Sequence, residues 1–388
     1  MIRSATIAGI GAAIALALAI PLISVGSAAA NVTSRLKSSA KGTVYFMIPD
    51  TTPSRYIAQD GPDFVAAVKA LAPGITVKMV NAGGNQSTQQ SQAEAAISAG
   101  AKALVVVAAD PPLSGGLLAY AHQKHVPVIG YENVPEDGPM YAQVEFNPEE
   151  AGALQGKYFA HEVISGVLGT YPVTLARIYG NNGDVYNTQM QKGQNKYLNP
   201  LIKAGKVKVV CSSYAANWAE TAAVTDMAQC LSSNNNKVRA VLTVYDGETQ
   251  GAIVAIGNAH LKAGLGKGDV AVFGGQNPTT IGLDYVLLGQ QQDDVIKPFL
   301  YEADAAAKLA VAAVEGKAPP AGMITSKVDS GNHNMVPTDF LNEAYVTAGA
   351  NAAAEINKYV VQTKTFTWAQ ICVGPVKSTS ACKAHGQG

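Results

Sequence analysis

Carboxylates, amides and aromatic rings recur in this chain where an apolar run gives way to a loop. Asp110 follows the run Ala103–Ala109 and is itself followed by Pro111 and Pro112. A short, uninterrupted, valine-rich run is typical of a strand buried on both faces of a parallel sheet. In open α/β sheets, ligands bind just beyond the carboxyl ends of such strands. Asp110 is therefore predicted at the lip of a crevice; the alternative is that it only turns or caps the chain.

Polar and aromatic residues also follow the other predicted strands. They are Arg55 and Tyr56 after Thr43–Pro49, Glu132 and Asn133 after Val126–Tyr131, Trp218 after Val207–Cys211, Tyr245 and Asp246 after Ala240–Val244, and Gln276 and Asn277 after Val270–Gly274. Amides, carboxylates and guanidinium groups can bridge adjacent hydroxyls, and aromatic faces cover the C–H side of a sugar ring. The set predicts a carbohydrate site, although any single member could be a cap or turn residue.

The elements that must position these residues alternate between strand and helix. Before Asp110, Ser87 and Gln90 have the spacing of a capping box, and the helix they begin is expected to end at Gly100. The alternation restarts with a helix at Pro148. Repeated βαβα order indicates parallel, doubly wound sheets with helices on both faces. Two such halves predict two lobes that face each other across a cleft.

Composition sets the class of protein. The chain has 388 residues, of which 48% are apolar and 14% charged, with equal numbers of acidic and basic residues. This is enough for two globular domains with substantial cores. A net charge of zero without a basic run argues against a nucleic-acid partner. The balance suits a protein that handles a neutral, polar ligand.

The first thirty residues differ from the rest. Arg3 precedes the apolar stretch Ile7–Val25, and small residues end with Ala30. This pattern predicts a secretory signal over residues 1–30, cleaved before Asn31, followed by a leader over residues 31–41. The apolar stretch is also long enough for an uncleaved membrane anchor, so that alternative stays open.

Four cysteines lie in a chain expected in an oxidising compartment, where disulfides persist. They are Cys211, Cys230, Cys372 and Cys382. Cys372 and Cys382 bracket a short segment and are favoured as a pair. Pairing of Cys211 with Cys230 is less favoured. The end of a strand and the end of the returning helix tend to place the two Cα atoms more than about 7 Å apart. No cysteine or histidine spacing indicates a metal site, and His122 and His125 lack a third ligand.

Several segments match a known family in their order and spacing. They are Ser54–Tyr56, Gln86–Gln92, Val126–Tyr131, Ser232–Val241, Tyr245–Asp246, Gly275–Asn277 and Ile296–Pro298. With them, nearly all of the chain after residue 41 resembles the periplasmic sugar-binding proteins of ABC importers, of the ribose/xylose type. The resemblance implies a type I periplasmic-binding-protein fold, or venus flytrap, of class α/β.

The fold implied by this resemblance has two doubly wound lobes joined by three hinge crossings. We place the crossings near Phe146, Asp294–Lys297 and Ser326–Ser330. The N-lobe would then comprise residues 42–146 plus 297–326, and the C-lobe residues 147–296 plus 327–388.

The resemblance also implies ligand-binding residues in the N-lobe. Arg55 matches a hydroxyl-bridging arginine, and Tyr56 stands where xylose-type members have a stacking tryptophan. Asp110 falls at an asparagine of that family. Glu132 matches an acidic ligand residue, but Asn133 replaces the arginine that usually follows it. These changes remove one guanidinium and leave the identity of the sugar open among pentoses, hexoses and polyols.

Five further residues are implied in the C-lobe and at the hinge. Trp218 matches a tryptophan of the C-lobe loop, and Lys297 a lysine beside the hinge. Asp246 and Asn277 match the polar ends of two strands, Asn277 in place of an aspartate. Asn187 is the fifth, in a loop that aligns in more than one way.

The resemblance implies an extracytoplasmic receptor that encloses a neutral sugar or polyol and delivers it to an ABC permease. We expect a monomer, without cofactor or metal. An enzyme is the first alternative, but G-x-S-x-G, Walker-A and H-E-x-x-H motifs are missing from the sequence, and the glycine-rich run Gly264–Gly268 more readily makes a turn. A sensor that presents its ligand to a membrane receptor is the second alternative, and the sequence does not separate it from a transport receptor.

Overall fold

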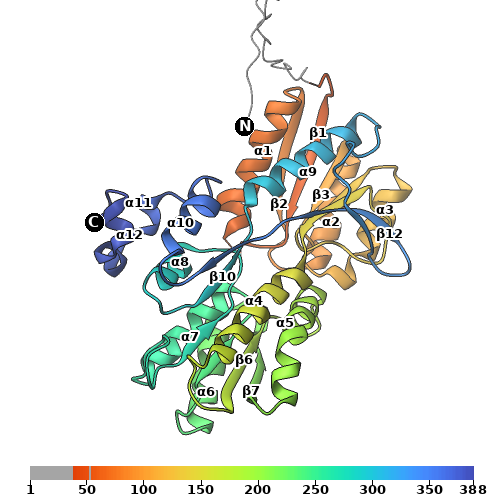
Figure 1. Ribbon diagram of the computed structural model, residues 1–388. Coiled ribbons are helices and arrows are strands. Elements are labelled where there is room, and N and C mark those ends of the chain that lie inside the picture. Colours follow the sequence, from red (N-terminus) through yellow and green to blue (C-terminus); the bar gives the residue numbers. More distant parts are fainter. Residues whose placement is uncertain (1–37, 52–53) are drawn as a thin grey trace, which may run out of the picture. The chain divides into compact units, whose positions relative to one another are not determined.

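Two parallel β-sheets and the helices that cover them make up most of the chain in the computed structural model, which describes residues 38–51 and 54–388 (Figure 1). The predicted signal segment, residues 1–30, and residues 31–37 of the predicted leader lie outside this part of the chain. Among the described residues, no helix is both long and apolar enough to cross a bilayer.

The first sheet has seven strands and carries the N-lobe. In spatial order they are β11 (Ser326–Asp329), β12 (Met335–Leu341), β5 (Ala142–Phe146), β4 (Val128–Tyr131), β3 (Ala101–Val106), β1 (Gly42–Ile48) and β2 (Ile75–Asn81). All neighbours are parallel except the pair β11 and β12. Helices α1 (Gly61–Leu71) and α9 (Phe299–Val314) pack on one face, and α2 (Gln86–Ser98) and α3 (Gly115–Gln123) on the other. Burial of β3 between these layers explains its apolar run.

The helix before β3 begins two residues earlier than the sequence suggested. Asn85, not Ser87, caps α2, and its side chain accepts a hydrogen bond from the backbone N–H of Thr88 at 2.8 Å. The predicted capping box is therefore wrong, because Asn85, an N-cap residue as favourable as serine, precedes it and caps the helix. The predicted stop is confirmed: Gly100 has φ 83°, in the left-handed region.

The second sheet has four parallel strands and carries the C-lobe. In spatial order they are β7 (Val207–Tyr214), β6 (Val173–Tyr179), β8 (Ala240–Leu242) and β9 (Ala271–Phe273). Helices α4 (Pro148–Ser165) and α5 (Val185–Lys203) cover one face, and α6 (Glu220–Ser233) and α7 (Asp246–Asn258) the other. Single bridges connect the β9 side of the sheet to β10 (Asp293–Ile296), which pairs antiparallel with β13 (Ala344–Thr347).

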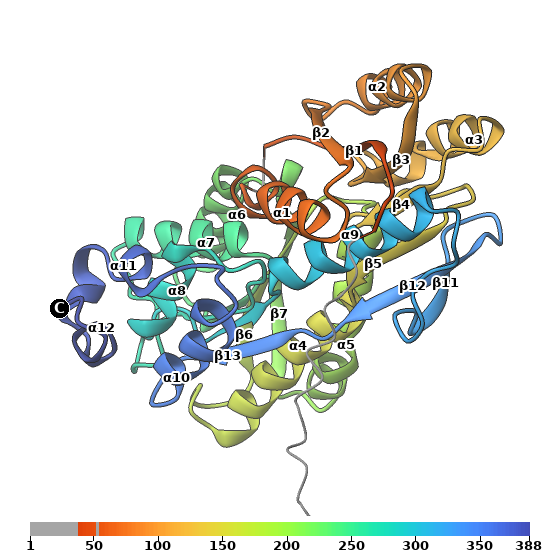
Figure 2. The same cartoon turned by 90° about the horizontal axis from the view of Figure 1, so that it is seen from above.

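The chain passes between the two lobes three times, and Figure 2 shows the passage from β12 to β13. Two of the passages follow β5 and β10, near Phe146 and Lys297. The predicted crossing at Ser326–Ser330 is wrong. Strand β12 continues the first sheet by pairing with β5 through Leu341, so the chain leaves the N-lobe only before β13.

The end of the chain forms a small helical cap on the C-lobe. Its elements are α10 (Ala352–Ile356), η4 (Asn357–Val361), α11 (Trp368–Ile371), η5 (Gly374–Ser378) and α12 (Ser380–Ala384). They share a core with α8 (Thr280–Leu287) and β10. The disulfide Cys372–Cys382, with Cα atoms 5.7 Å apart, confirms the favoured pairing.

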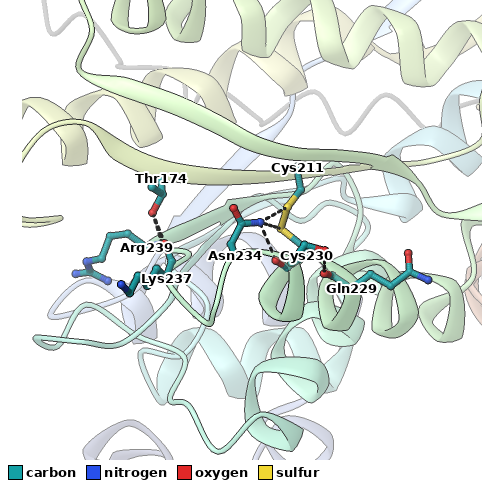
Figure 3. Close-up of a disulfide and its surroundings, with 8 residues drawn as sticks. Thr174, Cys211, Gln229, Cys230, Asn234, Lys237 and Arg239 are labelled. Carbon is teal, nitrogen blue, oxygen red and sulfur yellow. Dashed lines mark hydrogen bonds between the residues drawn. A yellow bond between two sulfur atoms is a disulfide. The ribbon is translucent and has the colours of Figure 1, made fainter.

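The second disulfide joins Cys211 to Cys230 (Figure 3), with Cα atoms 5.8 Å apart. The geometric objection to this pair was wrong, because β7 does not end at Cys211 but continues to Tyr214. Cys211 therefore lies within the strand, beneath the last turn of α6, where Cys230 is located. The bridge fixes α6 onto an edge strand of the second sheet.

Candidate functional site

A cleft of about 870 Å³ is lined by loops from both lobes. The N-lobe contributes the loops after β1, β2, β3 and β4, and the C-lobe those after β6, β7, β8 and β9. These are the carboxyl ends of parallel strands, where open α/β sheets bind ligands. The volume lies within the range of about 300–1,000 Å³ that is usual for ligand sites.

The structure brings six of the ten predicted site residues to the surface of this cleft. They are Tyr56, Asp110, Glu132, Asn133, Trp218 and Asn277. The other four, Arg55, Asn187, Asp246 and Lys297, are buried and do not line it. Their direct contact with a ligand stays a prediction, and the structure shows what they contact instead.

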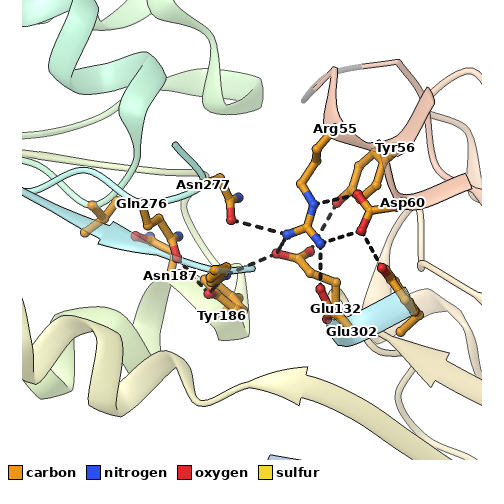
Figure 4. A network of polar contacts seen from close by, with 12 residues as sticks. Arg55, Tyr56, Asp60, Glu132, Tyr186, Asn187, Gln276, Asn277 and Glu302 are labelled. Carbon is orange, nitrogen blue, oxygen red and sulfur yellow. Dashed lines mark hydrogen bonds and ion pairs between the residues drawn. The ribbon is translucent and has the colours of Figure 1, made fainter. Parts of the chain in front are cut away.

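Arg55 lies behind the cleft and makes five hydrogen bonds to protein groups (Figure 4). Its guanidinium bonds both oxygens of Asp60 at 2.7 Å and Oε2 of Glu302 at 2.5 Å. Nη1 donates at 3.5 Å to Glu132 and at 3.3 Å to Asn277. A guanidinium has five N–H donors, so none remains for a sugar hydroxyl. In this arrangement Arg55 positions two cleft residues, one from each lobe.

Lys297 holds Glu132 from the hinge. Its Nζ lies 3.3 Å from Oε1 of Glu132 and also contacts the hydroxyl of Tyr186. Burial alone would raise the pKa of Glu132, but the charges of Lys297 and Arg55 outweigh it and lower that pKa below its ordinary value. Tyr56 donates a further hydrogen bond to Glu132 at 3.1 Å. The result is an ionised carboxylate, fixed in direction, at the wall of the cleft.

In two places the residue beside the predicted one reaches the cleft. Tyr186 lines it, whereas Asn187 bonds the backbone of Gly180 and Asn181 and so shapes the loop after β6. Tyr245 lines it, whereas the next residue turns inward at the start of α7. The first residues of a helix point to successive sides, so of two neighbouring residues only one side chain faces the cleft.

Asp246, the residue after Tyr245, is buried within the C-lobe. Its Oδ2 accepts hydrogen bonds from the backbone N–H of Thr279 at 2.9 Å and from its hydroxyl at 3.0 Å. Burial raises the pKa of Asp246 to about 7, despite these bonds. Its role in this structure is to tie the start of α7 to the loop before α8.

The backbone is strained where it lines the cleft. Glu132, Asn217, Trp218 and Asn277 all have φ between 54° and 58°, in the left-handed region. For residues other than glycine such a conformation costs of order 1–3 kcal/mol, least for asparagine, and it clusters at functional sites. Hydrogen bonds maintain it here: the indole of Trp218 donates to Oδ2 of Asp184 at 3.3 Å.

Aromatic rings from both lobes surround the cleft. Tyr56 comes from the N-lobe, and Tyr186, Trp218 and Tyr245 come from the C-lobe. The rings of Trp218 and Tyr245 meet edge to face, with centroids 6.0 Å apart. Such rings supply apolar faces, while Glu132, Asn133 and the other polar groups supply hydrogen-bond partners. The arrangement can bind a small molecule that has both an apolar face and many polar groups.

The described residues contain no group of three or more His, Cys, Asp or Glu side chains that could hold a metal ion. His122 lies in the last turn of α3, and no lining residue of the cleft is a histidine. The run Gly264–Gly268 lies between α7 and β9, in turns and bends rather than at a helix start. The chemistry of the site therefore rests on the side chains described above.

A family model described as a periplasmic binding protein domain matches residues 44–318. The chain belongs to this family. The D-xylose-binding periplasmic protein of Escherichia coli is 31% identical over 256 residues, which cover 65% of this chain and 73% of that protein. The multiple sugar-binding periplasmic receptor ChvE of Rhizobium radiobacter is 25% identical over 291 residues, covering 72% and 80%.

Solved structures show the same fold. An ABC transporter solute-binding protein from Clostridium phytofermentans, with bound β-D-glucose, superposes with a TM-score of 0.74 at 23% identity, over 85% of this chain and 100% of that chain. The expected type I fold of this periplasmic binding protein is thereby confirmed. Membership of the family implies an extracytoplasmic location, and the relatives are named as binding proteins, not as enzymes.

Proposed function

We propose that this periplasmic binding protein captures a sugar, a pentose or hexose, or a polyol between its lobes and delivers it to the permease of an ABC importer. The observation that carries the proposal is the cleft itself, which both lobes line with hydrogen-bonding and aromatic side chains. A ligand that contacts both lobes favours the closed state over the open one, because only a difference in affinity between states shifts their populations. The closed form is then the signal that a permease recognises.

The side chains divide the work of binding. Trp218 and Tyr56 offer aromatic faces from opposite lobes. Glu132, fixed by Lys297, offers carboxylate oxygens to ligand hydroxyls. Asn277 uses its Oδ1 on Arg55 and keeps its amide N–H groups for the cleft. The names of relatives such as the D-xylose-binding and multiple sugar-binding proteins support a hydroxylated ligand.

Titration calorimetry against pentoses, hexoses and polyols tests the proposal. We expect at least one of them to bind with a dissociation constant well below millimolar. Trp218→Ala should weaken that binding by roughly ten- to a hundredfold, the usual scale for loss of an aromatic contact of 1–3 kcal/mol. Trp368→Phe is the matched control, because Trp368 is buried in the C-terminal cap and stacks on His385. An absence of binding to the whole panel would contradict the proposal.

The partner and the location are part of the same proposal. We expect a monomer that acts outside the cytoplasm and docks on a membrane permease. Capture of a ligand is common to a transport receptor and to a sensor that presents its ligand to a membrane receptor. Uptake of the radiolabelled ligand by cells with and without the gene separates them, since a sensor alone leaves uptake unchanged.

A further inference from the structure

The charged groups on the surface of the cleft all have the same sign. Asp50, Asp110 and Glu132 line it from the N-lobe, and Asp184 lines it from the C-lobe. No lysine, arginine or histidine is among its described lining residues. One reason is in the sequence, where Asn133 occupies the position at which the resemblance led us to expect an arginine.

The two cations nearest the cleft, Arg55 and Lys297, bind protein groups behind its wall. Arg55 makes five hydrogen bonds to protein groups, and Lys297 contacts Glu132 and Tyr186. Burial raises the pKa of Glu302, a further partner of Arg55, to about 8, so this carboxyl is protonated near neutral pH. Two cations then balance two carboxylates, Asp60 and Glu132, and no positive charge is left for the cleft.

Asp110 and Asp184 have no cationic partner among the described residues. The carboxylate of Asp110 makes no hydrogen bond or ion pair with any described residue that would offset it. That of Asp184 accepts from the backbone N–H of Asn187 and from the indole of Trp218, which are both neutral donors. The nearby carboxyl of Glu136 is affected by these negative charges. Burial first, and then the charges of Asp137, Asp184 and Asp110, raise its pKa to about 7.

The same cleft also holds groups that call for a hydroxylated ligand with a positive end. Asn277 is only 7% exposed, and with Oδ1 on Arg55 its amide nitrogen has no partner among the described residues. Tyr245 is 9% exposed, and its hydroxyl likewise makes no hydrogen bond to the described chain. Aromatic faces such as that of Trp218 attract cations as well as sugar C–H groups.

We infer that, among sugars and polyols, this cleft prefers one that carries a protonated amino group, with Asp110 and Asp184 as the counter-charge. The inference rests on the proposed function and revises only the expectation of a neutral ligand. When the lobes close over a neutral ligand, both carboxylates lose water and gain no opposite charge, which disfavours closure unless it is offset. An ammonium group supplies that offset between the two lobes.

Matched pairs of ligands test this inference by calorimetry at pH 7 and low salt. Each pair is a neutral sugar or polyol and its amino-deoxy analogue, with the amine at carbon 1, 2 or 6, and the N-acetylated analogue is the uncharged control. We expect at least one amine to bind roughly tenfold more tightly than its neutral partner, and added salt to reduce the difference. Acetylation should abolish the gain.

Variants then connect the preference to the carboxylates. Asp110→Asn keeps the shape of the side chain and removes its charge, so the ratio of amine to neutral affinity should fall toward one. Asp329→Asn is the control; Asp329 is exposed on β11, near the start of β12 and so at the opposite end of the sheet from the cleft. Its ratio should match that of the unmodified protein.

The outcomes separate the two proposals. If neutral ligands bind as tightly as every amine, or if acetylated analogues keep the gain, the inference is overturned and the proposed function stands. An unchanged ratio in Asp110→Asn also overturns it. If no sugar or polyol of either kind binds, the proposed function itself fails.

Discussion

Two groups of buried carboxyls lie behind opposite walls of the cleft, and the protein stabilises them in different ways. Behind the N-lobe wall, Asp60, Glu132 and Glu302 surround Arg55, with Lys297 at the hinge (Figure 4). In the C-lobe, four carboxyls lie together or on adjacent elements without a basic partner in the described chain: Asp246, Glu248, Asp293 and Asp294. The first group contains two cations, Arg55 and Lys297, and the second group contains none.

The pKa directions express this difference. Lys297 and Arg55 lower the pKa of Glu132 in spite of its burial. In the second group burial raises the pKa of Asp246 and of Asp293 to about 7, and burial with the charges of these two raises that of Asp294 well above its ordinary value. The first group therefore presents a fixed anion to the cleft, whereas the carboxyls of the second group keep their protons to a higher pH than usual. Of the two groups, only the one behind the N-lobe wall contains ion pairs, and this group presents a carboxylate to the cleft.

Removal of Arg55 should have the largest effect. Arg55→Met leaves Asp60 and Glu132 as buried carboxylates with one guanidinium fewer, and breaking a buried pair costs about 3–5 kcal/mol. We expect the free energy of unfolding in urea to fall by that amount, together with loss of ligand binding.

Arg177→Met is the matched control. Arg177 is also buried, but its guanidinium donates to the neutral amides of Asn195 at 2.7 Å and Gln194 at 2.8 Å. Burial lowers the pKa of Arg177, and no carboxylate raises it. Its loss should cost about 1–3 kcal/mol, the range for hydrogen bonds to a charged group. Equal costs for the two variants would mean that charge pairing is not what distinguishes the first group.

The sequence predicted which loops form the cleft better than it predicted the hydrogen bonds between the residues behind it. Strand ends are visible as apolar runs that stop at polar residues, and Asp110, Glu132 and Asn277 all reach the cleft as predicted. The sequence did not show that protein groups take up all five hydrogen-bond donors of the Arg55 guanidinium. Glu302 lies 247 residues away on α9, so no local spacing indicates that it takes up a guanidinium donor.

In two places where a strand is followed by a helix, the residue that lines the cleft lies one position before the predicted residue. Tyr186 and Tyr245 line the cleft, whereas the neighbours Asn187 and Asp246 were predicted from their polarity. At a helix start the direction of each side chain depends on where the first turn begins, which sequence patterns locate only to within a few residues. Asn187 and Asp246 are buried polar side chains with structural hydrogen bonds, and their contact with a ligand stays a prediction.

A second prediction concerns the proton-stabilised group. A carboxyl whose pKa is raised by folding stabilises the fold fully below its unfolded pKa near 4, and this contribution is lost as the pH rises through the folded value. We expect the free energy of unfolding to decline between about pH 4 and 8. Asp294→Asn mimics the protonated acid, so relative to the unmodified protein it should gain roughly 1–3 kcal/mol at pH 8 and little at pH 5.

The pH profile of Asp329→Asn provides the comparison, because Asp329 is exposed and lies outside both groups. Its ionisable neighbour, His333, lies 3.7 Å away and is fully exposed, so this contact contributes little and the curve should closely parallel that of the unmodified protein. A gain for Asp294→Asn that is the same at pH 5 and pH 8 would show that Asp294 is already ionised in the folded protein at pH 5. The C-lobe group would then differ from the N-lobe group only in its neighbours.

The smallest effect is expected where a single neutral donor supports the second group. Tyr345 donates to Oδ2 of Asp293 at 2.7 Å, and this bond favours the ionised form against the effect of burial. Tyr345→Phe should cost about 1 kcal/mol at pH 5, where Asp293 is protonated, and somewhat more at pH 8, where a buried carboxylate loses its donor. Tyr141→Phe removes a hydroxyl that donates to the carbonyl of Lys317 at 2.9 Å, so its cost should not depend on pH. If both variants lose the same stability at both pH values, Asp293 does not ionise in the folded protein over this range, and protons alone stabilise the C-lobe group.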